Sequence, residues 1–100
     1  MGQIRWSIEA YDWLKNVRDY IAKDKPVIAQ KLAKGIIEKI NLLREFPEIG
    51  YRLSTAAGKQ VRVLLYGHYR IVYQINPDKD INLLGIFHGA LDLKKHLKPD

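Results

Sequence analysis

Gln60-Val61-Arg62-Val63-Leu64-Leu65-Tyr66-Gly67-His68-Tyr69-Arg70-Ile71-Val72-Tyr73-Gln74-Ile75 is the stretch that decides the fold. It holds two runs rich in β-branched and aromatic residues, a composition typical of half-buried strands, on either side of Gly67-His68. A glycine at the first central position of a two-residue turn tolerates the positive φ that such turns require. The stretch therefore predicts an antiparallel hairpin with Tyr66 opposite Tyr69.

This pairing register decides which side chains share a face of the sheet, because alternate residues of a strand point to opposite faces. One face is expected to hold Arg62, Leu64, Tyr66, Tyr69, Ile71 and Tyr73. The other is expected to hold Val61, Val63, Leu65, Arg70, Val72 and Gln74. Both faces are too apolar to be fully hydrated, so we expect helices to cover one and another structure, such as a partner, to cover part of the other.

The rest of the chain adds strands and two helices to this hairpin. Residues 81–87 read as a further strand, and Gln3–Trp6 as a short edge strand. Ser7 is placed to cap a helix that runs to about Lys23. A second helix is expected from about Pro26 to Glu45, and residues 51–58 as a polar connection with room for a short strand over 51–53.

Apolar residues at helical spacing predict the buried stripe of each helix. The first stripe is expected at Ile8, Tyr11, Leu14, Val17 and Ile21, widened by Ala10, Trp13 and Tyr20. The second is expected at Ala29, Ala33, Ile36, Ile40 and Leu43, widened by Leu32 and Ile37. The fold class is therefore α+β, in the order β-α-α-β-β-β: a short N-terminal strand, then an antiparallel helical hairpin packed on a C-terminal antiparallel β-meander.

Length and composition indicate a single domain over residues 1–100, with 89–100 as a C-terminal tail. The longest apolar runs fall far short of the ~20 residues of a membrane helix, and no signal peptide begins the chain. We therefore expect a cytoplasmic protein with no membrane partner. The chain has no cysteine, and its three histidines lack zinc-binding spacing, so we expect no metal and no cofactor.

The net charge of +6 favours an acidic partner, which could be nucleic acid, an acidic protein segment or the surface of the ribosome. The charge does not choose among these partners. Basic surfaces also serve solubility alone, and that interpretation stays open beside the others.

Four segments carry a resemblance to a known family: the bend FPEIG at 46–50, VRVL at 61–64, YRIVYQI at 69–75 and IFHGALD at 86–92. Together with the early helix they resemble the RelE/ParE superfamily of toxins, and the resemblance covers nearly the whole chain. It implies the toxin of a type II toxin-antitoxin, or plasmid stabilisation, module. Such a toxin is held inactive in a hetero-oligomer by a cognate antitoxin that is acidic and partly disordered.

The superfamily divides by target. RelE-like members cut messenger RNA on the ribosome with sheet lysines and arginines, and Arg70 matches the arginine of their YRxVY strand. Val61 and Val63, however, stand at the lysine positions, and Leu91 at the arginine expected beyond the last strand. Losing most of these cations would slow phosphodiester cleavage by several orders of magnitude. The segment 86–93 instead looks like the end of ParE-like toxins, which poison DNA gyrase without hydrolysis.

Three residues are candidates for catalysis if the chain is a ribosome-dependent endoribonuclease: Arg62, Arg70 and His88. Each also has a structural interpretation. Arg62 could be ordinary packing between tyrosines of the sheet, and Arg70 could bond Asp92 or a backbone carbonyl, because a charge on an aliphatic face needs a partner. His88 could serve as a hydrogen-bonding group or a cap, since no serine or second carboxylate stands at a telling spacing.

The tail offers the candidate target-binding residues, in which leucines alternate with basic side chains. They are Leu91, Leu93, Lys94, Lys95 and His96. Apolar anchors beside cations suit docking on an acidic protein surface better than catalysis, although a solvated tail has the same composition. The sequence therefore favours a ParE-like toxin that binds gyrase, with the endoribonuclease and an inactive antitoxin-binding remnant as alternatives.

Overall fold

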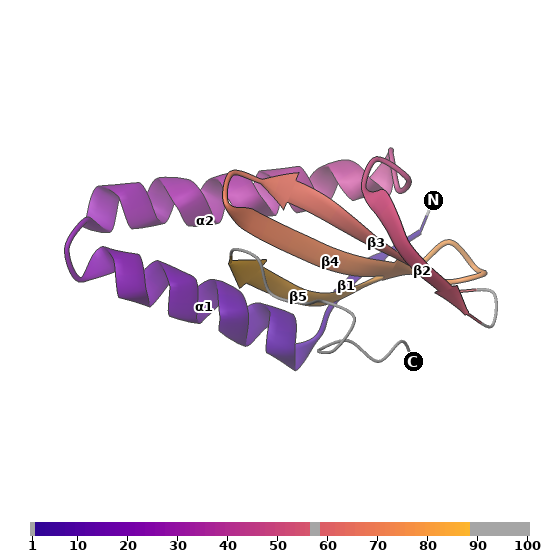
Figure 1. Ribbon diagram of the computed structural model, residues 1–100. Coiled ribbons are helices and arrows are strands. Elements are labelled where there is room, and N and C mark those ends of the chain that lie inside the picture. The colour runs from indigo at the N-terminus through magenta and orange to yellow at the C-terminus, as the bar shows by residue number, and fades with distance from the viewer. Residues whose placement is uncertain (1, 57–58, 89–100) are drawn as a thin grey trace.

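The predicted hairpin lies in the middle of a five-stranded sheet (Figure 1). In the computed structural model, which describes residues 2–56 and 59–88, β3 (Lys59–Tyr66) and β4 (Tyr69–Ile75) pair antiparallel with Tyr66 opposite Tyr69. Gly67 has a φ of 59°, the left-handed conformation that the turn requires. The predicted register of this hairpin is therefore confirmed.

Three more strands complete the sheet in the order β1-β5-β4-β3-β2. β5 (Ile81–His88) and β2 (Tyr51–Ala56) extend the antiparallel meander, and β1 (Ile4–Trp6) is an edge strand parallel to β5. The meander has four strands, because β2 continues beyond the expected residue 53. A register shift between Arg52 and Ser54, typical of a bulge, lets the strand bend and go on pairing with β3.

Two helices form the antiparallel hairpin that was expected, and they reach beyond the end of the sheet where β3 turns into β4 (Figure 1). The Ser7 hydroxyl caps α1 (Ile8–Ala22) by accepting a hydrogen bond from the Ala10 amide at 3.0 Å. α2 (Pro26–Asn41) starts with proline in its first turn, where the missing N–H costs nothing. A 3₁₀ turn, η1 (Leu42–Arg44), continues it almost to the expected end.

The helices cover one face of the sheet, and the main core lies between the helices and that face. Its buried members are Ala10, Leu14, Ile36, Ile40, Leu43, Leu64, Ile71, Tyr73, Ile75, Ile81, Leu83 and Ile86. The predicted stripe of α2 is largely correct, although Ile37 is 40% exposed. The stripe of α1 is wrong at its start, because Ile8 is 79% and Tyr11 60% exposed. The α1 side chains that face the core are those of Ala10 and Leu14, which lie on a different side of the helix from Ile8 and Tyr11.

The opposite face of the sheet carries a second, smaller cluster made of Val61, Val63, Val72 and Phe87, with Leu53 and Leu84 packed against it. α1 reaches this cluster at the edge of the sheet, where the rings of Trp13 and Phe87 lie 5.2 Å apart between centroids. Both faces of the sheet are thus largely removed from water, as their apolar composition indicates.

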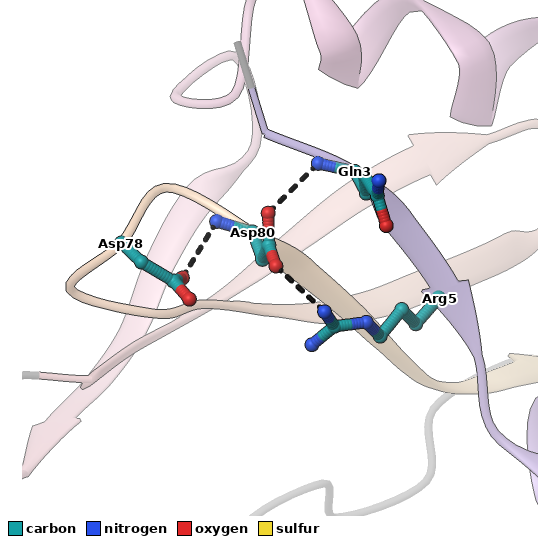
Figure 2. Close-up of polar contacts among 4 residues, drawn as sticks. All are labelled: Gln3, Arg5, Asp78 and Asp80. Carbon is teal, nitrogen blue, oxygen red and sulfur yellow. Dashed lines mark hydrogen bonds and ion pairs between the residues drawn. The ribbon is translucent and has the colours of Figure 1, made fainter.

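Asp80 fastens the N-terminal strand to the loop between β4 and β5 (Figure 2). Its Oδ1 accepts a hydrogen bond from the Gln3 amide at 2.9 Å, and its Oδ2 lies 2.9 Å from Nη2 of Arg5. The Asp78 carboxylate in turn accepts the Asp80 amide at 3.0 Å, which orders the loop. One carboxylate therefore bonds the backbone of Gln3, just before β1, and the side chain of Arg5 within β1.

We expect Asp80→Ala to lower the free energy of unfolding by about 1–2 kcal/mol, since it removes one charge-assisted backbone bond and one ion pair. Arg5→Ala removes only the ion pair, whose arginine is 59% exposed, and should cost about 0.5 kcal/mol. Urea denaturation of both variants checks this. Equal losses would mean that the bond to the Gln3 amide contributes nothing.

Candidate functional site

Arg62 of β3 fixes the bend formed by residues 46–50, which joins the helical layer to the sheet. Its Nη1 donates to the carbonyl oxygens of Gly50 at 2.7 Å and Glu48 at 3.2 Å, and its Nε donates to the Gln60 side chain at 3.1 Å. The residue is only 9% exposed. A buried arginine is tolerated when its N–H groups have hydrogen-bond acceptors, and here two of the three acceptors are backbone carbonyls.

Tyr73 of β4 holds the same bend from beside Arg62. Its hydroxyl donates to the Pro47 carbonyl at 2.7 Å and accepts the Gly50 amide at 3.0 Å. Burial raises the pKa of this hydroxyl above its ordinary value of 10.0, although the Gly50 amide and the Arg62 cation act in the opposite direction. A side chain at Gly50 would lie 2.7 Å from both the Tyr73 hydroxyl and the Val63 carbonyl, so only glycine fits this bend.

The rigid bend displays large apolar side chains instead of burying them. Phe46 is 53% exposed, and Ile49 and Tyr51 are each 45% exposed. We call these three residues the bend patch. Sequence reasoning did not find this patch, and the available signal was three large apolar residues close to Pro47, at positions 46, 49 and 51.

Arg70 lies on the other face of the sheet, half-buried, between Leu65 of β3 and Phe87 of β5. Within the described ranges no hydrogen bond or ion pair engages its guanidinium. The expected bond to a backbone carbonyl is therefore not found among these residues, and Asp92, the other expected partner, lies outside them. Arg62 and Arg70 do not meet, because they point to opposite faces.

The remaining predicted positions fall into two groups. Val61 and Val63 point into the second cluster and are each 1% exposed, so no solvent-facing side chain stands at either position. The backbone of His88 pairs with Tyr69 at the end of β5. The His88 side chain and the predicted target-binding residues lie outside what the structure describes, namely Leu91, Leu93, Lys94, Lys95 and His96.

An apolar groove of about 510 Å³ runs between α1 and the start of β4. Its lining residues are Trp13, Asn16, Val17, Tyr20, Ile21 and Tyr69. Sequence reasoning assigned Trp13 and Tyr20 to the buried stripe of the helix, whereas they form the rim of this groove. Grooves of this kind accept apolar side chains of a peptide or a small molecule.

Two kinds of site are not found in the described ranges. Across residues 2–56 and 59–88, no three histidine or acidic side chains gather where they could hold a metal ion. The same ranges contain no helix with the length and apolar character needed to cross a membrane.

A family model described as the ParE toxin of the type II toxin-antitoxin system parDE matches residues 4–93. The chain belongs to this family. Toxin RelE2 of Caulobacter vibrioides is 33% identical over 90 residues, which cover 90% of this chain and 98% of that protein. The resemblance to the RelE/ParE superfamily stated from the motifs is therefore confirmed.

Solved structures place this ParE-family toxin in the same fold. A chain of the chromosomal ParDE system of P. aeruginosa superposes with a TM-score of 0.74 at 22% identity, over 90% of this chain and 98% of that one. The archaeal RelE-RelB complex of Pyrococcus horikoshii gives 0.68 at 16% identity, over 87% and 93%. The predicted α+β architecture, with helices on one face of a sheet that ends in a meander, is therefore confirmed.

Proposed function

We propose that this ParE-family toxin inhibits DNA gyrase by binding it and carries out no chemistry of its own. The observation that supports this most is the dispersal of the cations that RNA cleavage would need. Arg62 bonds the bend on one face of the sheet, and Arg70 lies on the other face. The two positions at which lysines were expected hold the buried Val61 and Val63. Metal-free cleavage needs a base and several cations around one phosphate, and the described residues do not converge in that way.

The tail is the proposed gyrase-binding segment. Leu91 and Leu93 would bury apolar area on the target, and Lys94, Lys95 and His96 would steer the tail toward acidic surface. The net charge of +6 acts in the same sense. Because gyrase acts on chromosomal DNA, we place the toxin in the cytoplasm.

The partner that neutralises the toxin is proposed to be a cognate antitoxin, an acidic and partly disordered protein that folds as it binds. Superposable toxins were solved as ParDE and RelE-RelB assemblies. The groove along α1 and the bend patch offer apolar surface to which such an antitoxin could bind. Toxin and antitoxin together would form a plasmid or chromosomal stabilisation module.

A supercoiling assay beside an in vitro translation assay tests this function. We expect the purified toxin to block supercoiling and leave translation intact. The double variant Lys94→Ala/Lys95→Ala should need at least about tenfold more protein for the same inhibition, since two steering charges are lost. Lys15→Ala/Lys31→Ala removes the same charge from the helices and serves as the matched control.

The rival function, a ribosome-dependent endoribonuclease, is favoured by one observation, the unengaged guanidinium of Arg70 in the described ranges. Cleaved messenger with unchanged supercoiling would establish it, and Arg70→Ala should then abolish cleavage without changing the melting temperature. If the chain inhibits neither supercoiling nor translation while an antitoxin still binds it, the chain is an inactive antitoxin-binding remnant.

A further inference from the structure

The face of the sheet that carries the second cluster is shut off from water. Val61, Val63 and Val72 of this cluster are at most 1% exposed. Gln74, which pairs with Val61 on the same face, is 0% exposed, and its Oε1 has no hydrogen-bond partner in the described ranges. Water would supply that partner if it reached the oxygen. Another layer of the protein must therefore lie over this face.

The described segments do not supply this layer. All five strands belong to one sheet, and α1 and α2 lie on its other face (Figure 1). The cluster contacts Leu53 and Leu84, which are part of the sheet itself, and Trp13 reaches it only at its edge. Residues 57 and 58 are too few to form a layer. The cover must come from the segment that follows the last strand.

Residues 89–100 begin close to the second cluster. His88, the last residue of β5, pairs with Tyr69 at the start of β4. Val72 lies three residues further along β4, which is about 10 Å. The twelve residues after His88 span up to about 40 Å when extended, so the segment is long enough to cross the whole cluster.

We propose that residues 89–100 fold back over the second cluster and pack Leu91, Leu93 and Leu97 against its valines. Leucines suit an apolar face, and the lysines between them have stems long enough to keep their ammonium groups in water. The groove along α1 is the other apolar surface near the start of the segment. It is open, with Tyr20 77% exposed, so it is not the surface that is covered.

This packing has a consequence that rests on the proposed function. The leucines that anchor the toxin on gyrase are the same leucines that lie on the toxin's own sheet. Gyrase then binds only the fraction of molecules in which the segment is released, and its apparent affinity falls by that fraction. The segment therefore acts as an autoinhibitory latch.

Urea denaturation of the full chain, without any partner, tests the packing. Leu93→Ser should raise the equilibrium constant for unfolding about 30-fold, because a buried leucine loses its apolar contacts. Leu65→Ser is the matched control, since Leu65 lies on the same face of β3 as Val63 but is 55% exposed. It should change the constant by less than about fivefold. A solvated segment would make Leu93→Ser neutral, and that result would overturn the proposal.

Double variants test where the segment lies. Leu93→Ser and Val63→Ala remove the same contact, so their joint effect on the unfolding constant should fall at least about threefold short of the product of the single effects. Leu93→Ser with Val17→Ala, in the groove along α1, should give the plain product. Coupling to Val17 instead of Val63 would place the segment in the groove and overturn the proposal.

Loosening the contact from the sheet side tests the latch. Val63→Thr leaves the segment itself intact and should let the toxin inhibit supercoiling at a concentration at least about threefold lower. Val27→Thr, at a 63% exposed position of α2, is the control and should leave that concentration unchanged. An unchanged or higher concentration for Val63→Thr would overturn the latch. If the segment packs but no variant inhibits gyrase, the proposed function fails and the packing stands.

Discussion

Replacing Arg62 with alanine should lower the free energy of unfolding by about 3 kcal/mol, a large share of the stability of so small a domain. The substitution leaves the carbonyls of Glu48 and Gly50 without their donor. It also opens a cavity beside Tyr73, the next side chain across the sheet. Buried acceptors that lose their partners cost about 1–3 kcal/mol each, and urea denaturation followed by circular dichroism measures the sum.

Arg52 provides the matched control, because it pairs directly with Arg62 across β2 and β3 but is exposed. Arg52→Ala should change the stability by no more than about 0.5 kcal/mol. Similar losses for the two variants would contradict the role assigned to Arg62 in holding the bend.

Replacing Tyr73 with phenylalanine should cost about 2–3 kcal/mol at neutral pH while keeping the ring in place. The missing hydroxyl leaves the Gly50 amide without an acceptor and the Pro47 carbonyl without a donor. Tyr20→Phe, at a 77% exposed position, should be close to neutral and is the control. Thermal unfolding of the pair would refute this role if both variants melted together.

Alkaline titration gives an independent test of Tyr73. Because burial raises the pKa of its hydroxyl, the folded protein holds this proton after the unfolded chain has released it. The contribution of the Tyr73 hydroxyl to the free energy of unfolding is therefore complete below about pH 10, and it is lost as the pH rises through the folded pKa. Tyr73→Phe lacks this group, so the difference in the free energy of unfolding between the two proteins should narrow as the pH rises above about 10.

Local rules predicted those parts of the fold that local interactions decide. A two-residue turn containing Gly67 sets the whole register of β3 and β4, and a serine sets the start of α1. The full length of β2 was missed, because its small polar residues carry no strand pattern. Their pairing is set by β3 and a register shift. Ile8 and Tyr11 were misplaced because several apolar residues of α1 offered more than one stripe.

The role of Arg62 shows why a site is harder to predict than a fold. Its sequence neighbours indicate only that a cation stands on a strand with tyrosines nearby. The carbonyls that it binds belong to Glu48 and Gly50, and the folded sheet brings them to it. The bend patch has a sequence signal, but only the fold shows that its side chains stay exposed. The separation of Arg62 and Arg70 onto two faces, by contrast, followed from the register alone.

The parallel pairing of β1 with β5 delays folding of the chain during its synthesis. The Gln3 amide meets its acceptor Asp80 across 77 positions of sequence, so the N-terminal strand stays unpaired until the last strand has left the ribosome. A nascent chain that ends before residue 81 contains both helices but lacks the strand on which β1 and much of α1 pack. The domain is therefore completed late in its own synthesis, and translation that aborts early releases a fragment without a finished sheet.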